Sequence, residues 1–164
     1  MERLYTPWRL PYVTDASRSV HPCIFCDALE RTDEPLVVHL GVHAFIILNK
    51  FPYNNGHVMV VPRRHIGRLS DLSDAETAEI MSLTQACERA LGTVYDPHGF
   101  NVGINLGKPA GAGVLDHLHL HVVPRWNGDT SFMTVCGDTR VLPEDLDVTA
   151  TRLRAVLVGE IAGR

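Results

Sequence analysis

One short segment constrains the fold of this chain more than any other. His117, His119 and His121 alternate with apolar residues in the stretch HLHLHVV, residues 117–123. Such alternation predicts a β-strand, because successive side chains of a strand point to opposite faces. The apolar side can seal a core, while the three imidazoles share the other side at intervals of roughly 7 Å. The segment therefore predicts a sheet that carries a histidine cluster on one face.

Three histidines on one strand face have three interpretations: an exposed polar face, a metal clamp, or catalysis. Three imidazoles on one face are improbable by chance, since histidine is uncommon. A single tetrahedral ion with bonds of about 2 Å is awkward to hold, because alternate strand residues diverge. A neutral imidazole is nucleophilic near neutral pH without a strong base. We favour a catalytic cluster over the other two interpretations.

The rest of the chain predicts an α+β domain. Further β-rich runs lie at 36–39, 43–48, 57–62 and 99–104, and Asn54-Asn55-Gly56 tolerates positive φ in a tight turn. Ser73 and Glu76 form a capping box before a long helix, in which Ile80, Leu83, Thr84, Cys87, Leu91 and Val94 follow at helical spacing. A second helix is expected over 147–162. These elements predict an antiparallel sheet of about five strands with one long and one C-terminal helix.

Length and composition indicate one globular unit. The 164 residues contain 45% hydrophobic and 21% charged residues, which is ordinary for a single domain. We expect residues 1–164 to form one domain. Residues 1–22 would be an arm packed on its body, and 127–164 a C-terminal extension packed on the domain.

Charge and hydropathy exclude several classes of partner. The net charge of −4 argues against a general nucleic-acid binder, although the run Arg63-Arg64-His65 leaves a locally basic pocket open. The N-terminus lacks the pattern of a secretory signal, and no window approaches the ~20 apolar residues of a membrane span. We expect a cytoplasmic protein without a membrane partner, whose four cysteines form no disulfide framework.

The segment HLHLHVV resembles the His-φ-His-φ-His-φ-φ signature of the histidine-triad (HIT) family of nucleotide hydrolases and transferases. Asn49, the turn ending in Gly56-His57, and the strand VMVVPRRH stand upstream at the spacing of that family. The whole chain, including TPWR, CIFC and WNGDTSFMTVCGDTRVLPE, resembles the bacterial diadenosine tetraphosphate phosphorylases within it. The resemblance implies a HIT-like fold and an enzyme that transfers nucleotidyl groups.

The resemblance also implies roles for individual histidines. His119 would attack an α-phosphate and form a covalent nucleotidyl-histidine. His121 would hydrogen-bond the phosphate oxygens, and His57 would orient the triad, unless it is an ordinary half-buried histidine after a turn. Attack by inorganic phosphate would then complete phosphorolysis of diadenosine tetraphosphate to ATP and ADP. The alternatives are a dinucleoside polyphosphate or nucleoside phosphoramidate hydrolase and, least favoured, a non-catalytic nucleotide sensor.

Substrate-binding groups are expected around the triad. The small residues of the loop 107–113 let backbone amides approach an anion, which makes Gly111, Ala112 and Gly113 candidates for phosphate binding. The resemblance places Asn105 near phosphate, Asn49 at the ribose hydroxyls, and Trp126 at the wall of the acceptor site. Each asparagine has an alternative role as a strand-ending turn former, and Trp126 as a core residue.

One departure from the family pattern bears on the acceptor. Hydrolytic members usually carry Gln-Ser or Gln-Thr four and three residues before the first triad histidine, where this chain has Gly113 and Val114. The missing polar pair would help to protonate the leaving group or to position water. Inorganic phosphate brings its own charge and protons, so the departure favours phosphorolysis.

Cys23 and Cys26 have the spacing of a metal knuckle. A zinc site needs about four ligands, so the pair by itself leaves two redox-active thiols as the alternative. The resemblance supplies His65 and His117 as the remaining ligands of a structural Zn²⁺ that ties the N-terminal arm to the sheet. Cys136 has no assigned role. Any Mg²⁺ is expected to arrive with the substrate, because the sequence has no Walker loop.

The resemblance finally implies self-association. Family members pair through the long helix and the adjoining strand, so a homodimer or higher homo-oligomer is expected.

Overall fold

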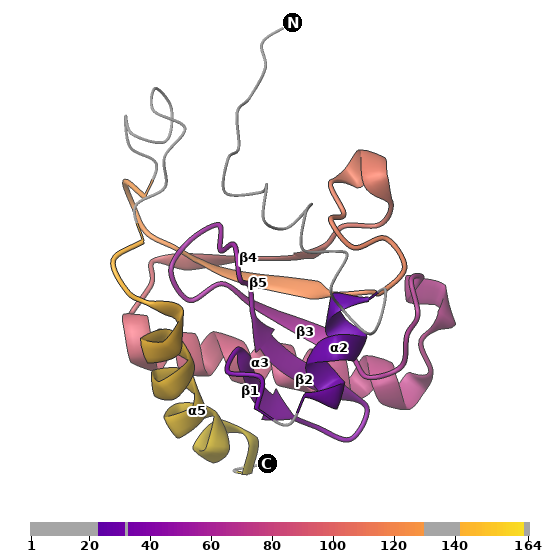
Figure 1. The fold of residues 1–164 in the computed structure, drawn as a ribbon. Coiled ribbons are helices and arrows are strands. Elements are labelled where there is room, and N and C mark those ends of the chain that lie inside the picture. The colour runs from indigo at the N-terminus through magenta and orange to yellow at the C-terminus, as the bar shows by residue number, and fades with distance from the viewer. Residues whose placement is uncertain (1–22, 32, 130–141, 163–164) are drawn as a thin grey trace, which may run out of the picture.

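The computed structural model describes residues 23–31, 33–129 and 142–162 as one antiparallel sheet with helices on both faces (Figure 1). The strand order is β1-β2-β3-β5-β4. The strands are β1 (Val37–Leu40), β2 (Ala44–Leu48), β3 (Val58–Pro62), β4 (Gly99–Ile104) and β5 (Leu120–Arg125). The α+β architecture is confirmed, and all five strands form where the sequence predicts them, with small shifts at their ends.

Among the described residues, three α-helices accompany the sheet: α2 (Ile24–Glu30), α3 (Asp74–Tyr95) and α5 (Leu146–Ala162). The predicted capping box opens α3, since the Ser73 hydroxyl accepts the Glu76 N–H at 3.3 Å and Glu76 Oε2 accepts the Ser73 N–H at 2.8 Å. The helix expected over 147–162 is confirmed as α5. None of the described helices has the length and hydropathy needed to cross a bilayer.

Helix α2 was not predicted, because its sequence carries weak local signals. It has seven residues and no capping side chain at Cys23. A helix this short is not stable alone, and tertiary packing has to hold it in place. Phe25 and Ala28 supply that packing, since both are buried against the sheet.

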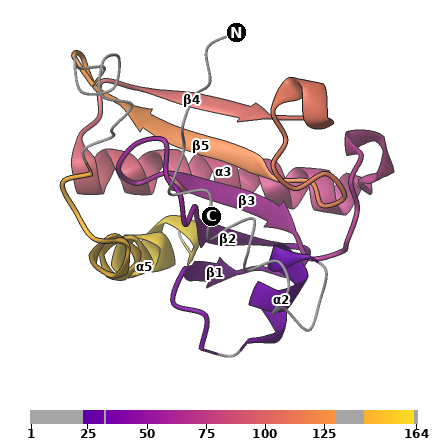
Figure 2. The same cartoon turned by 45° about the horizontal axis from the view of Figure 1, so that its top comes forward.

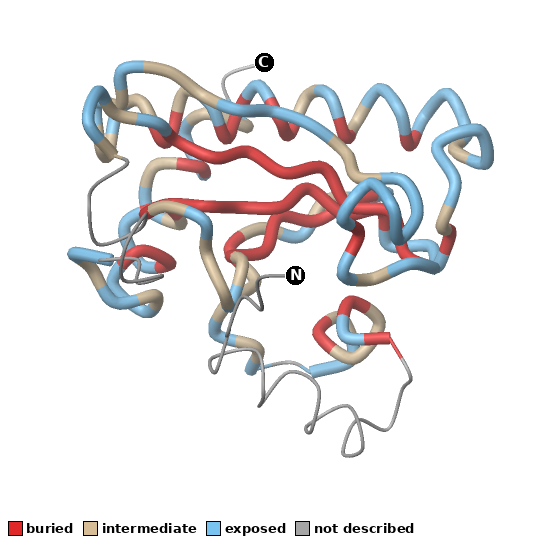
Figure 3. The backbone as a smooth tube through the Cα atoms, turned by 90° about the horizontal axis from the view of Figure 1, so that it is seen from above, coloured by how far each residue is buried: buried red, intermediate tan, exposed pale blue. Residues whose placement is uncertain are grey.

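The two faces of the sheet bury two different clusters. Figure 2 shows the helices on either side of the sheet, and Figure 3 shows that its central strands are buried. Helices α3 and α5 cover one face, where alternate strand residues such as Ile46, Val60 and Leu120 are buried. Helix α2 lies on the opposite face, against Phe45 and Met59 among others. Because strand side chains alternate, the triad histidines lie on the α2 side while Leu120 packs under α3.

Strand β5 begins three residues later than predicted, at Leu120 rather than at residue 117. The pairing of β5 with β3 ends at Val60 of β3. Farther along β3, Pro62 has no backbone N–H to donate to a partner strand. The Leu118 N–H donates instead to Ile66 O at 2.6 Å. The first two triad histidines therefore lie in an irregular segment that leads into the strand.

Two parts of the expected organisation lie outside the described residues. These are the N-terminal arm, residues 1–22, and, in the C-terminal extension, residues 163–164 and 130–141, the latter including Cys136. Within the described part of that extension, α5 packs against α3 and β1.

Gly56 in the turn before β3 is expected to resist substitution. Its φ is +74°, and a Cβ there would lie 2.9 Å from Leu91 Cδ2. Gly56→Ala should lower the free energy of unfolding by about 1–3 kcal/mol, measured by urea denaturation. Gly92→Ala in α3 is the matched control, because its Cβ meets nothing within 4 Å and should raise stability by about 0.5–1 kcal/mol. Equal effects of the two variants would contradict this explanation.

Candidate active site

Four histidines gather on the α2 face of the sheet. His119 and His121 have ring centroids 4.9 Å apart, and His57, directly before β3, lies 5.1 Å from His121. His117 lies at the other end of the group, beside Phe25. All four rings are buried. The convergence predicted for the three triad histidines is thus present, and His57 joins them.

A backbone carbonyl fixes the tautomer of His119. Its Nδ1 lies 2.8 Å from His117 O, and a carbonyl only accepts, so Nδ1 carries the proton. The lone pair is therefore on Nε2. No described residue hydrogen-bonds to that nitrogen. This is the arrangement that a histidine nucleophile needs, with one nitrogen anchored and the other available.

His57 and His121 form a second hydrogen-bonded unit. Nε2 of His57 lies 2.8 Å from Nδ1 of His121, and the backbone N–H of Tyr53 donates to Nδ1 of His57 at 3.1 Å. His57 is therefore fully buried and in contact with the triad, while the orienting role expected for it stays a prediction.

Burial keeps the triad imidazoles neutral. Desolvation lowers the pKa of His119, and desolvation together with nearby His119 lowers the pKa of His121 to about 4. A neutral ring at position 119 retains its nucleophilic lone pair at pH 7. A neutral ring at position 121 still has one N–H to donate.

The depressed pKa of His121 predicts how stability depends on pH. The pKa of His121 falls from its ordinary value of 6.5 in the unfolded chain to about 4 in the folded protein. As the pH falls, His121 therefore becomes protonated in the unfolded chain before it does in the folded protein. The stabilisation that is present above pH 6.5 is lost as the pH approaches 4. We expect His121 alone to account for a loss of roughly 3 kcal/mol in the free energy of unfolding over that window. Urea denaturation at several pH values measures it.

The control for this prediction is His121→Asn, which cannot titrate. Comparison with the wild type cancels the contributions of every other group, provided that both proteins fold. The pH dependence should be shallower in the variant. An identical slope in the two proteins would contradict the assignment to His121.

The glycine-rich loop before the triad adopts a tight conformation. Gly107 and Gly111 have φ values of +81° and +91°, which suit glycine. The amides of Gly111 and Ala112 donate within the loop, to Lys108 O at 3.0 Å and Gly107 O at 3.3 Å. Phosphate binding by Gly111, Ala112 and Gly113 thus stays a prediction. It requires the amides of Gly111 and Ala112 to leave their carbonyl partners in the loop and donate to phosphate instead.

The remaining predicted substrate residues are only partly brought together. Asn105 lies beside the loop, with Nδ2 3.9 Å from a Cβ built on Gly111. Asn49 Oδ1 accepts the Phe51 N–H at 2.9 Å, which is the turn-forming alternative. Trp126 follows the far end of β5, five strand residues or roughly 16 Å beyond His121. Roles in ribose or acceptor binding stay predictions.

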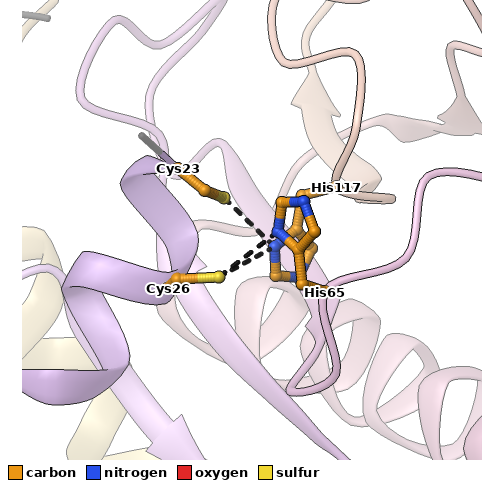
Figure 4. Close-up of side chains that lie close together, drawn as sticks. All are labelled: Cys23, Cys26, His65 and His117. Atoms are coloured by element: carbon orange, nitrogen blue, oxygen red, sulfur yellow. Dashed lines mark hydrogen bonds between the residues drawn. The ribbon is translucent and has the colours of Figure 1, made fainter. Parts of the chain in front are cut away.

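A second cluster adjoins the triad (Figure 4). It combines Cys23 and Cys26 of the α2 region with His65, after β3, and His117. The four ligand atoms lie within 4.8 Å of one another. Cys23 Sγ is 3.2 Å from His117 Nδ1, and Cys26 Sγ is 3.3 Å from His65 Nδ1. The structure thus assembles the four residues that the sequence resemblance implied.

The chemistry of this cluster fits a tetrahedral metal ion. Zinc bonds of 2.3 Å to sulfur and 2.0–2.1 Å to nitrogen place sulfur and nitrogen ligands roughly 3.5 Å apart. Burial, followed by the neighbouring Cys23 thiol, raises the pKa of Cys26 to about 11, so a Cys26 thiolate needs a cation beside it. His117 Nε2 donates to Pro62 O at 2.8 Å, which leaves Nδ1 as the ligand atom.

Two residues of the site escaped the sequence analysis. Phe25, between the two cysteines, packs on His117 and His119 at centroid distances of 5.3 and 5.1 Å. Tyr53 stacks on His57 at 4.7 Å and on His121 at 5.8 Å. Neither position carries a strong local signal. An aromatic residue inside a cysteine pair, or just before the turn that leads to His57, was the available hint.

Comparisons with known proteins agree with this geometry. The HIT domain family profile matches residues 34–128. An AP-4-A phosphorylase of Mycobacterium tuberculosis is 45% identical over 152 residues, covering 88% of this chain and 78% of that protein. An adenosine 5'-monophosphoramidase of Schizosaccharomyces pombe is 27% identical over 124 residues, or 76% and 90% of the two chains.

A solved structure gives the same result. The Zn-bound histidine triad family protein from Mycobacterium smegmatis has a TM-score of 0.70 and 31% identity, covering 87% of this chain and 97% of that one. Fold, triad geometry and sequence similarity agree, and this chain belongs to the HIT family.

Proposed function

We propose that this protein is a nucleotidyl-transferring enzyme that phosphorolyses diadenosine tetraphosphate to ATP and ADP. The observation that carries the proposal is the tautomer of His119, whose anchored Nδ1 leaves Nε2 as a nucleophile next to the ring of His121. Similarity to the AP-4-A phosphorylase of Mycobacterium tuberculosis supports the choice of substrate.

In the first step, His119 Nε2 attacks the α-phosphorus, the one bonded to the 5′-oxygen of one adenosine of diadenosine tetraphosphate. The bond from that phosphorus to the bridging oxygen breaks, so ATP leaves and AMP stays bound to the imidazole. His117 O holds the Nδ1 proton while the ring becomes positive. An N–H of His121 stabilises the charge that develops on the phosphoryl oxygens.

In the second step, inorganic phosphate attacks the adenylyl-histidine. The phosphorus–nitrogen bond breaks, His119 is restored and ADP is released. Val114 packs on the α2 side of the core and offers no side-chain hydrogen bond to position a water molecule. This absence of a polar group supports phosphate, rather than water, as the acceptor.

Product analysis with and without phosphate tests the proposal. ATP and ADP should form from diadenosine tetraphosphate only when phosphate is present. AMP and ATP formed from water would make the protein a hydrolase, like the alternative enzymes on this fold. Nucleotide binding with no turnover under either condition would make it a sensor.

The same proposal includes a structural Zn²⁺ held by Cys23, Cys26, His65 and His117. The proximity of the four ligand atoms, all within 4.8 Å of one another, supports it, and so does the Zn-bound relative from Mycobacterium smegmatis. With four protein ligands the ion has no open position, so it organises the site without taking part in the reaction. Magnesium, where it is used, enters with the polyphosphate.

The proposal also covers assembly and location: one domain, a homodimer or larger homo-oligomer, and a cytoplasmic enzyme with no nucleic-acid or membrane partner. The edge strand β4 supports self-association, since Val102 is 51% exposed there, as does Met81 on α3 at 52%. The basic run is consistent with the absence of nucleic acid. Arg64 pairs with Glu76 at 2.9 Å and Arg63 donates to Gly41 O.

A further inference from the structure

Neighbouring histidines of this site need opposite tautomers. The nucleophile His119 must carry its lone pair on Nε2, whereas His121 has to present a proton to the phosphate. His117 O enforces the first requirement. A different backbone group must enforce the second, because the N–H of His121 could sit on either ring nitrogen.

That group is the backbone N–H of Tyr53, which acts on His121 through His57. The Tyr53 N–H is an obligate donor and lies 3.1 Å from His57 Nδ1, so this nitrogen accepts and a neutral His57 is protonated on Nε2. That Nε2–H points at His121 Nδ1, 2.8 Å away, which makes Nδ1 of His121 an acceptor. The single proton of neutral His121 is then on Nε2.

The Tyr53 ring reinforces this chain of hydrogen bonds. It lies on His57 with an interplanar angle of 34° and stacks on His121 at 26°. His57 is 1% exposed and His121 9% exposed, whereas Tyr53 is 43% exposed. The tyrosine thus covers both rings on the solvent side, where water would otherwise compete for their nitrogens.

We propose that Tyr53 is a positioning residue of the active site. Its backbone N–H sets the tautomer of His57, and through it that of His121, so that Nε2–H of His121 faces the substrate. If His57 were protonated on Nδ1 instead, the Tyr53 N–H and the Nδ1–H of His57 would point at each other. Nε2 of His121 would then direct a lone pair at an anionic oxygen. The inference rests on the proposed function for the statement that His121 meets phosphate.

A spectroscopic measurement on the unmodified protein tests the tautomers directly. Two-bond ¹H–¹⁵N correlation spectra of the histidine-labelled, zinc-loaded enzyme at pH 7 distinguish protonated from bare ring nitrogens. We expect protonated Nε2 on His57 and His121 and protonated Nδ1 on His119. A protonated Nδ1 on His57 would overturn the proposal.

Two variants separate the amide of Tyr53 from its ring. Tyr53→Ala keeps the N–H and loses the ring, while Tyr53→Pro loses both. We expect Tyr53→Pro to have a kcat roughly 10- to 100-fold below that of Tyr53→Ala, with little difference in KM, because the lost donor acts on the transition state. Equal kcat values and unchanged tautomers in the two variants would contradict the proposal. If Tyr53→Pro does not fold, the spectrum of the unmodified protein decides.

This experiment distinguishes the inference from the proposed function. The tautomers are read without substrate, whereas the function is read from the adenylyl-enzyme. Correct tautomers without any covalent intermediate would refute the function and leave the positioning intact. A covalent intermediate on His119 with the opposite tautomer on His57 would refute only the role of Tyr53.

Discussion

His119→Ala is expected to abolish the covalent nucleotidyl-enzyme and to lower kcat by at least about 10⁴-fold. The reason is geometric, since His119 is the triad residue whose Nδ1 is anchored on a backbone carbonyl, leaving Nε2 as the nucleophile. Neither His121 nor His57 replaces it, because their facing nitrogens, 2.8 Å apart, are engaged with each other. Turnover of diadenosine tetraphosphate and trapping with radiolabelled substrate measure the two effects.

Controls make this result specific. His43→Ala removes an exposed imidazole outside the site and should leave turnover unchanged. Added imidazole should restore part of the activity of His119→Ala, because the small molecule can occupy the space of the missing ring. Label attached to any residue other than His119, or turnover without a covalent species, would contradict the mechanism.

Loss of one metal ligand is expected to have the next largest effect. His65→Ala should reduce bound zinc from about one per chain to well below that value and lower the free energy of unfolding by several kcal/mol, because metal binding contributes directly to folding. The remaining thiols and His117 would then line a site with too few ligands for a tetrahedral ion. Metal analysis and thermal unfolding, each with and without a chelator, measure the change.

The matched control is again His43→Ala, since both side chains are exposed and neither residue lies in a helix or strand. It should retain zinc and its response to chelator. Wild-type protein purified without chelator that holds far less than one zinc per chain, or that keeps its melting temperature when chelated, would contradict the metal assignment.

One residue connects the two clusters. His117 directs Nδ1 toward the cysteines, donates from Nε2 to Pro62 O, and offers its own carbonyl to His119. Phe25 packs on both His117 and His119. We therefore expect a change at the metal site to reach the nucleophile through His117 and Phe25, so activity should be measured alongside zinc content.

Local sequence patterns were sufficient for most of the architecture. The period-2 alternation before Val123 placed Leu118 and Leu120 on the buried α3 side and the imidazoles on the other, as observed. The Ser73 capping box and the turn at Gly56 are also short-range features, and both appear where they were expected. Each involves residues within a few positions of one another, so the sequence alone reveals them.

The protonation pattern and the metal cluster depend on contacts between distant residues. Cys23 and His117 are 94 positions apart, and His57 and His121 are 64 apart. Which nitrogen of His119 or His121 carries the proton depends on a carbonyl and on the amide of Tyr53, and backbone groups are the same in every sequence. The sequence by itself therefore determined that the triad histidines share one face of the sheet. Only the tertiary structure decided how they are joined, because hydrogen-bond direction is a property of relative position and not of residue type.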